Sequence, residues 1–126
     1  MAKSEFKDVI TQMVVPDVVK TAEYYRDVLG FEILGYFLDP PVYAMLRRGN
    51  VEMHFGKSDT GEVLRNESIR KGLGTDAYIF VSDVHALYEE YSAAGANIKM
   101  AITKRPYGCT EFEILDCDGH KLVFAD

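Results

Sequence analysis

Glu52 and His54 are the residues of this sequence whose types and spacing could support acid–base chemistry. They lie two positions apart in residues 51–56, where alternating side chains predict a β-strand, so both project from the same face. A carboxylate beside an imidazole can accept and return a proton. Glu52 and His54 are therefore candidate catalytic residues, with Asp76 as a further group that could act with Glu52.

Alternation along the other predicted strands places more polar and aromatic side chains on the face that carries Glu52 and His54. Such a mixture is typical of a small-molecule cavity, although the solvated outer face of an open sheet is the alternative. The predicted ligand-binding residues are Gln12, Glu52, His54, Asp76, Tyr78, Phe80, Tyr107, Glu111 and Glu113. The opposite, apolar face is predicted to form the core and carries Met13, Val15, Val51, Met53, Phe55, Ile79, Val81, Leu122 and Phe124.

Four carboxylates on one face would repel each other unless a cation neutralised them. We therefore expect a cationic ligand, held over the rings of Tyr78, Phe80 and Tyr107, with Tyr43 or Phe37 as further stacking candidates. The 14 Lys and Arg against 20 Asp and Glu give a net charge of -6 that agrees with this expectation. Basic residues form no stripe, so nucleic acid is not an expected partner.

Nothing in the sequence has the length of a membrane span or the pattern of a signal peptide, so we expect a cytoplasmic protein without a membrane partner. Cys109 and Cys117 form no CxxC pair and have no obvious base beside them, which disfavours a cysteine nucleophile. His85 at a helix start and His120 in a turn are predicted to be solvated.

The elements that must position these residues come as a repeat. Asp17 and Asp83 each precede a helical apolar pattern as N-caps, and Gly30 and Gly95 end those patterns. The predicted strands are 6–15, 31–37, 42–48 and 51–56, then 76–81, 98–103, 110–115 and 120–125. We expect one domain, 1–126, made of two βαβββ modules at about 5–56 and 75–126, joined by a connector at 57–74 with a short helical turn near 62–69.

These motifs resemble the vicinal oxygen chelate superfamily, which includes glyoxalase I, extradiol dioxygenases and the bleomycin-resistance proteins. The resemblance rests on residues 15–31, on residues 51–55 and on residues 107–120, in this order. It implies an α+β fold, with paired βαβββ modules forming a curled eight-stranded mixed sheet around a cavity. It also implies a homodimer that completes the cavity.

The resemblance further implies where a metal would be held, because metal-dependent members carry ligands on the first and last strand of each module. Matched by counting from the caps and the turns, these positions are Ile10, Glu52, Asp76 and Val123. Ile and Val have no lone pair to donate, so no metal and no other cofactor is expected. Extradiol chemistry, which needs two His and one carboxylate around the metal, is excluded because none of the four positions is a His. His54 could serve as a displaced third ligand.

The function favoured by this resemblance is that of the bleomycin-resistance branch: a metal-independent protein that sequesters a cationic or aromatic compound, with antibiotic resistance as the associated role. The alternative is a glyoxalase-like lyase or isomerase that uses Glu52 with His54 or Asp76 for proton transfer. A purely structural subunit is a third possibility. Whether the protein is an enzyme stays open, with a non-catalytic binding protein favoured.

Overall fold

The computed structural model describes residues 2–126 and contains two consecutive βαβββ units. The first unit consists of β1 (Thr11–Val15), α1 (Val18–Asp27), β2 (Glu32–Phe37), β3 (Tyr43–Arg48) and β4 (Val51–Lys57). The second consists of β5 (Ala77–Phe80), α2 (Val84–Ala93), β6 (Asn97–Lys104), β7 (Thr110–Leu115) and β8 (Lys121–Ala125). We call them the N-terminal and the C-terminal module.

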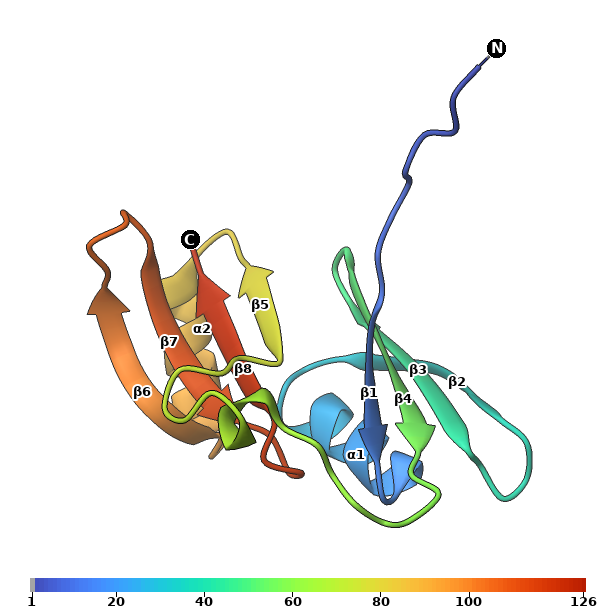
Figure 1. The fold of residues 1–126 in the computed structure, drawn as a ribbon. Helices are drawn as coiled ribbons and strands as arrows, with labels where there is room; N and C mark the ends of the chain where they lie inside the picture. The colour runs from blue at the N-terminus through green and yellow to red at the C-terminus, as the bar shows by residue number, and fades with distance from the viewer. Residues whose placement is uncertain (1) are drawn as a thin grey trace.

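Each module forms its own four-stranded mixed sheet, ordered β1-β4-β3-β2 and β5-β8-β7-β6 (Figure 1). The pairs β1–β4 and β5–β8 are parallel, and the remaining pairs are antiparallel. One helix covers one face of each sheet, as the alternating apolar side chains require. The predicted α+β fold with eight strands in paired modules is confirmed.

The ends of both helices follow from the predicted caps. The Asp17 carboxylate accepts hydrogen bonds from the backbone N–H groups of Val19 and Lys20, and Asp83 accepts one from Ala86. Gly30 and Gly95, with φ of 76° and 80°, follow the helices in the left-handed conformation that glycine adopts without strain.

The apolar face predicted from alternation is the core. Met13, Val15, Met53, Phe55, Ile79, Leu122 and Phe124 are buried, and Val51 and Val81 are partly buried against them. Tyr25 and Tyr91 bring the apolar stripes of α1 and α2 into the same core.

Two predicted elements are too long. Strand β1 begins at Thr11 rather than near residue 6, and Phe6 is fully exposed on a segment that extends away from the body (Figure 1). Strand β4, which pairs with β1, begins only at Val51, and Thr11 already lies opposite Met53. The residues near position 6 therefore have no strand to pair with. The helical turn expected near 62–69 is a single 3-10 turn, Asn66–Ser68.

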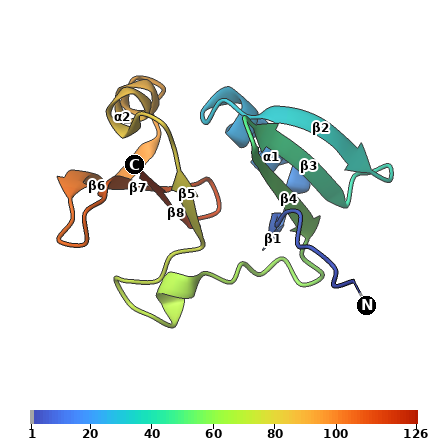
Figure 2. The ribbon, with the colours of Figure 1, turned by 90° about the horizontal axis from the view of Figure 1, so that it is seen from above.

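Side-chain hydrogen bonds, rather than a continuous sheet, join the two modules. The Tyr25 hydroxyl donates to Asp116 Oδ2 at 2.6 Å, and the Tyr91 hydroxyl donates to the Leu29 carbonyl at 2.8 Å. Figure 2 shows the modules side by side, with the connector passing from one to the other. Among residues 2–126, no helix has the length and apolar character needed to cross a membrane.

Candidate functional site

The N-terminal module carries a chain of hydrogen bonds on the sheet face opposite α1. Gln12 on β1 donates from Nε2 to the Tyr43 hydroxyl on β3 at 2.9 Å. That hydroxyl lies 2.8 Å from His54 Nδ1, and His54 Nε2 lies 2.6 Å from Glu52 Oε2. The strand pairing explains why these side chains are close, because Gln12 and His54 are direct partners across β1 and β4. The structure thus brings three predicted site residues together through Tyr43.

The direction of these hydrogen bonds follows from the chemistry of the partners. A carboxylate only accepts, so the hydrogen of neutral His54 is assigned to Nε2. Nδ1 is then free to accept the Tyr43 hydroxyl proton, while the Tyr43 oxygen accepts from Gln12. The side chains of His54 and Glu52 are only 16% and 30% exposed, so this order is held by the sheet.

The C-terminal module places a buried carboxylate at the centre of its corresponding face. Glu111 is 3% exposed and accepts the hydroxyl protons of Tyr78 and Tyr107, while Arg105 Nε lies 3.5 Å from Glu111 Oε1. Phe80 packs against Tyr78 with ring centroids 5.2 Å apart. Tyr78, Phe80 and Tyr107 remain 44%, 67% and 60% exposed, and we call these three residues the aromatic platform.

The tyrosines of this platform are held as hydrogen-bond donors. Burial, and then the hydrogen bond to Glu111, raise the pKa of Tyr78 above its usual value. The hydrogen bond to Glu111 is the main cause of the raised pKa of Tyr107. Both hydroxyls are therefore protonated at neutral pH and fix the carboxylate of Glu111.

Lys121 is a residue of this face that sequence reasoning missed. Its side chain is 2% exposed, and Nζ lies 3.4 Å from Glu67 Oε1 and 3.7 Å from Glu113 Oε1. Nζ also donates to the Gly72 carbonyl at 3.4 Å, which ties the connector to the sheet. A lysine within the otherwise apolar run of β8 is the sequence signal that could have identified it.

Asp76 does not join Glu52 and His54. Its Oδ1 accepts from the backbone N–H of Asn66 at 3.0 Å, and its Oδ2 accepts from that of Lys121 at 2.9 Å. Asp76 therefore holds the connector against β8. Glu52, Glu111 and Glu113 likewise have hydrogen-bond or ion-pair partners within the chain. The expectation that these four carboxylates need a cationic ligand to neutralise them is therefore wrong.

The four positions at which the resemblance implied metal ligands do not fit an ion here. Ile10 and Val123 have no donor atoms, and both oxygens of Asp76 accept backbone N–H groups. The ladders also correct the counting of strand positions: Val123 corresponds to His54, and Lys121 corresponds to Glu52. Counting failed because the turn before β8 is longer than the two-residue turn before β4.

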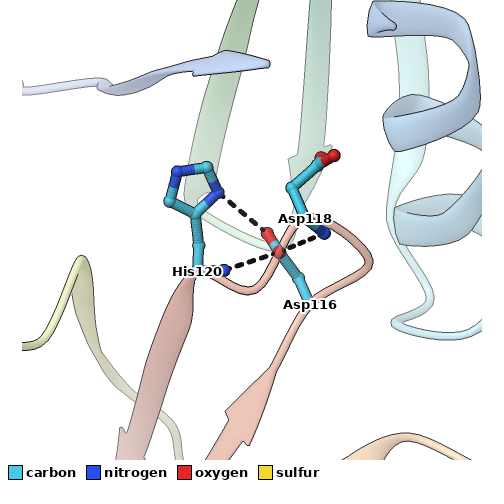
Figure 3. A group of neighbouring side chains, drawn as sticks. All are labelled: Asp116, Asp118 and His120. Atoms are coloured by element: carbon cyan, nitrogen blue, oxygen red, sulfur yellow. Dashed lines mark hydrogen bonds and ion pairs between the residues drawn. The ribbon is translucent and has the colours of Figure 1, made fainter. Parts of the chain in front are cut away.

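Asp116, Asp118 and His120 form a compact cluster in that longer turn (Figure 3). Asp116 Oδ1 accepts from the backbone N–H groups of Asp118 and His120, and its Oδ2 accepts from Tyr25. The Asp118 carboxylate turns away and accepts from the Thr21 hydroxyl. These oxygens are already engaged, so the cluster serves to fix the turn and to hold it against α1.

His120 is buried, and the prediction that it is solvated is wrong. It is 2% exposed, with Nδ1 3.5 Å from Asp116 Oδ2 and Nε2 3.2 Å from the Leu64 carbonyl. Burial lowers its pKa, but the hydrogen bond and charge of Asp116 outweigh burial and raise the pKa overall. The connector covers the ring, which a sequence pattern of turn residues does not reveal. His85 is exposed as predicted.

Open clefts lie beside these groups. One of about 580 Å³ borders Ile10, Arg47, Asn50 and Glu52 at the start of β4. Another of about 390 Å³ borders Gln12, Val14, Asp76 and His120 at the junction with the connector. Both are large enough for a small molecule to approach the Gln12-to-Glu52 chain.

The chain is similar to known proteins in sequence pattern and in fold. The model of the Glyoxalase/Bleomycin resistance protein/Dioxygenase superfamily matches residues 9–124. No curated protein matches the chain in sequence.

Among solved structures, a bleomycin-binding protein from bleomycin-producing Streptomyces verticillus, complexed with copper(II)-bleomycin, is 24% identical with a TM-score of 0.72, covering 97% of both chains. A bleomycin resistance determinant encoded on the transposon Tn5 is 18% identical with a TM-score of 0.75, covering 96% of this chain and 98% of its own. Lactoylglutathione lyase from Agrobacterium tumefaciens is 17% identical with a TM-score of 0.71, covering 98% and 95%. These similarities establish a shared fold.

Proposed function

Because the chain belongs to the Glyoxalase/Bleomycin resistance protein/Dioxygenase superfamily, we propose that it binds and sequesters a small aromatic compound, cationic in preference to anionic, without a metal. The observation that carries this proposal is the aromatic platform around Glu111. If the natural ligand is a toxic compound such as an antibiotic, stoichiometric binding in the cytoplasm would confer resistance. Relatives of the same fold include a protein complexed with copper(II)-bleomycin.

The platform is suited to hold a flat ring. Tyr78 and Phe80 are fixed by their contact with each other, and Tyr78 and Tyr107 are also fixed through Glu111. Rings that are already immobile lose little conformational entropy when a ligand stacks on them. The apolar Val123 lies in the same ladder, opposite Tyr78, and offers no competing polar group.

The charge preference follows from the rings and from the whole chain. The faces of Tyr78 and Phe80 attract cations, whereas the Tyr107 ring already has the Arg105 guanidinium 5.7 Å from its centroid. The net charge of -6 favours a positive ligand at long range. The paired carboxylates do not require a cation. Aromatic stacking therefore supplies most of the expected affinity, and charge supplies the preference.

We also propose that the binding site is completed in a homodimer. Val14, Phe37 and Phe80 expose 48%, 58% and 67% of their surface on the open sheet faces. The segment before β1 exposes Phe6 and Val9 almost completely. A second copy would cover such apolar surface, and light scattering during size-exclusion chromatography would give the mass of a dimer.

Titration calorimetry with proflavine, a flat cationic dye, tests the proposed binding. We expect saturable binding that Phe80→Ala weakens roughly tenfold, because one stacking ring is lost. Tyr36→Ala is the control, since it removes a partly exposed ring of β2 outside the platform. Chromatography after binding should recover the dye unchanged. Equal affinity of both variants, or tighter binding of the anionic dye anilinonaphthalene sulfonate, would contradict the proposal.

A further inference from the structure

The hydrogen-bond chain of the N-terminal module is not needed to bind an aromatic ring. It differs from the aromatic platform because the Tyr43 hydroxyl accepts from Gln12 and also donates to the His54 imidazole, which in turn reaches Glu52. Tyr43 lies between Gln12 and His54, and Glu52 lies beyond His54. The order matches a nucleophile or base, a proton acceptor and an orienting carboxylate.

We propose that Tyr43, His54 and Glu52 form a general-base relay that abstracts a proton from a bound carbon acid, a small molecule with an electron-poor C–H bond. Tyr43 is the catalytic residue because its oxygen meets the substrate. His54 and Glu52 act through Tyr43. Gln12 positions the phenol by donating to its oxygen.

The proton balance of the step is complete without a co-reactant. As the substrate C–H bond breaks, its proton forms an O–H bond with Tyr43, and the original Tyr43 proton passes to His54 Nδ1. Glu52 stabilises the resulting imidazolium through Nε2. The electron pair of the C–H bond remains on the substrate, where it can expel a leaving group or take back the proton at another carbon.

The ladder neighbours of Tyr43 on β4 and β2 are a glycine and an apolar ring. Gly56 is its direct partner on β4, so no side chain stands beside the ring on that strand. On the other side Phe37 of β2 is the ladder partner of Tyr43 and is 58% exposed. Phe37 therefore offers an exposed apolar ring next to Tyr43, against which a flat, weakly acidic molecule can stack.

The contrast with the C-terminal module supports an active role for these residues. The ladder position of His54 is occupied there by Val123, and the position of Glu52 by Lys121. The fold is therefore stable at these positions without an imidazole or a carboxylate. Architecture alone does not require the relay.

Base-catalysed opening of 5-nitrobenzisoxazole is a direct test, because removal of the C–H proton of its isoxazole ring breaks the N–O bond and releases a coloured phenolate. We expect the wild-type protein to accelerate this reaction above buffer, and Tyr43→Phe to lose roughly 100-fold in kcat/KM. His54→Gln should lose most of the rate and Glu52→Gln a smaller part. Tyr36→Phe, on the same sheet but outside the relay, should retain the full rate.

A rescue experiment separates proton transfer from a structural role. Added imidazole should restore part of the rate to His54→Ala, and it should restore none to Tyr43→Phe. No acceleration by the wild-type protein, or equal rates for wild type and Tyr43→Phe, would overturn the proposal. Circular dichroism of each variant checks that it is folded. Failure of the relay leaves the binding proposal intact, because the aromatic platform belongs to the other module.

Discussion

The two open sheet faces share a framework but use it in opposite ways. By their strand pairing, Gln12 is equivalent to Tyr78, and Tyr43 is equivalent to Glu111. In the N-terminal module Gln12 donates a hydrogen bond to Tyr43, and in the C-terminal module Tyr78 donates one to Glu111. The N-terminal face continues to a second acceptor, His54. The C-terminal face ends at a carboxylate that only accepts.

This difference shows how one hydrogen bond can serve two purposes. In the N-terminal module the hydroxyl of Tyr43 accepts from Gln12 and donates to His54, which is the arrangement that the proposed proton transfer requires. In the C-terminal module Glu111 collects donors from Tyr78, Tyr107 and the neighbouring Arg105, so the rings are locked. We expect the C-terminal face to matter more for stability and the N-terminal face more for reactivity.

Glu111→Leu should have the largest effect on stability. It leaves two hydroxyls and a guanidinium without their shared acceptor, which should lower the free energy of unfolding by about 3 kcal/mol. Urea unfolding followed by circular dichroism measures this. Glu111→Gln keeps a carbonyl acceptor and should lose less. If Glu111→Leu were as stable as wild type, the locked character of this face would be refuted.

Lys121→Met should have the next largest effect. The methionine fills the buried space, but Glu67, Glu113 and the Gly72 carbonyl lose their donor, at a cost of about 2 kcal/mol. Its counterpart Glu52→Gln removes a partly exposed charge and should cost less than about 1 kcal/mol. The same urea experiment compares the two. Equal losses would show that the faces do not differ in this respect.

His54→Val places on the N-terminal sheet face the residue type that Val123 has at the equivalent position of the C-terminal face. Tyr43 and Glu52 lose their partner but remain partly exposed to water, so the cost should be about 1 kcal/mol. Binding of proflavine should be unaffected, and the opening of 5-nitrobenzisoxazole should be lost. A weaker affinity for proflavine would mean that both faces hold the dye.

The smallest effect should come from pH. A raised pKa of His120 in the folded protein means that its protonation stabilises the fold below its unfolded value of 6.5, and that this contribution disappears as the pH rises through the folded value. Wild type should therefore exceed His120→Gln in stability by more in acid than in mild base. The corresponding N-terminal turn, Gly49-Asn50, has no titratable group. A constant difference across this pH range would contradict the prediction.

The sequence predicted the fold through local signals that act within a few residues. Caps at Asp17 and Asp83 and alternation of apolar residues need no knowledge of distant contacts. The site was predicted less completely, because its hydrogen bonds join residues far apart in the chain. Alternation placed His54 and Glu111 on the open faces, but it could not show that Asp76 would accept from Asn66 or that the connector would bury His120.

The completeness of each module's sheet has a practical consequence for fragment assembly. Within residues 2–126, every strand pairs only with strands of its own module, and the bonds between modules come from side chains such as Tyr25 and Tyr91. Gly61 in the connector is exposed, and a Cβ added there would meet nothing within 4 Å. A chain divided at Gly61 would yield two halves that each contain the residues of a full sheet and its helix, so Gly61 is the place to divide the chain when reassembly of two fragments is tested.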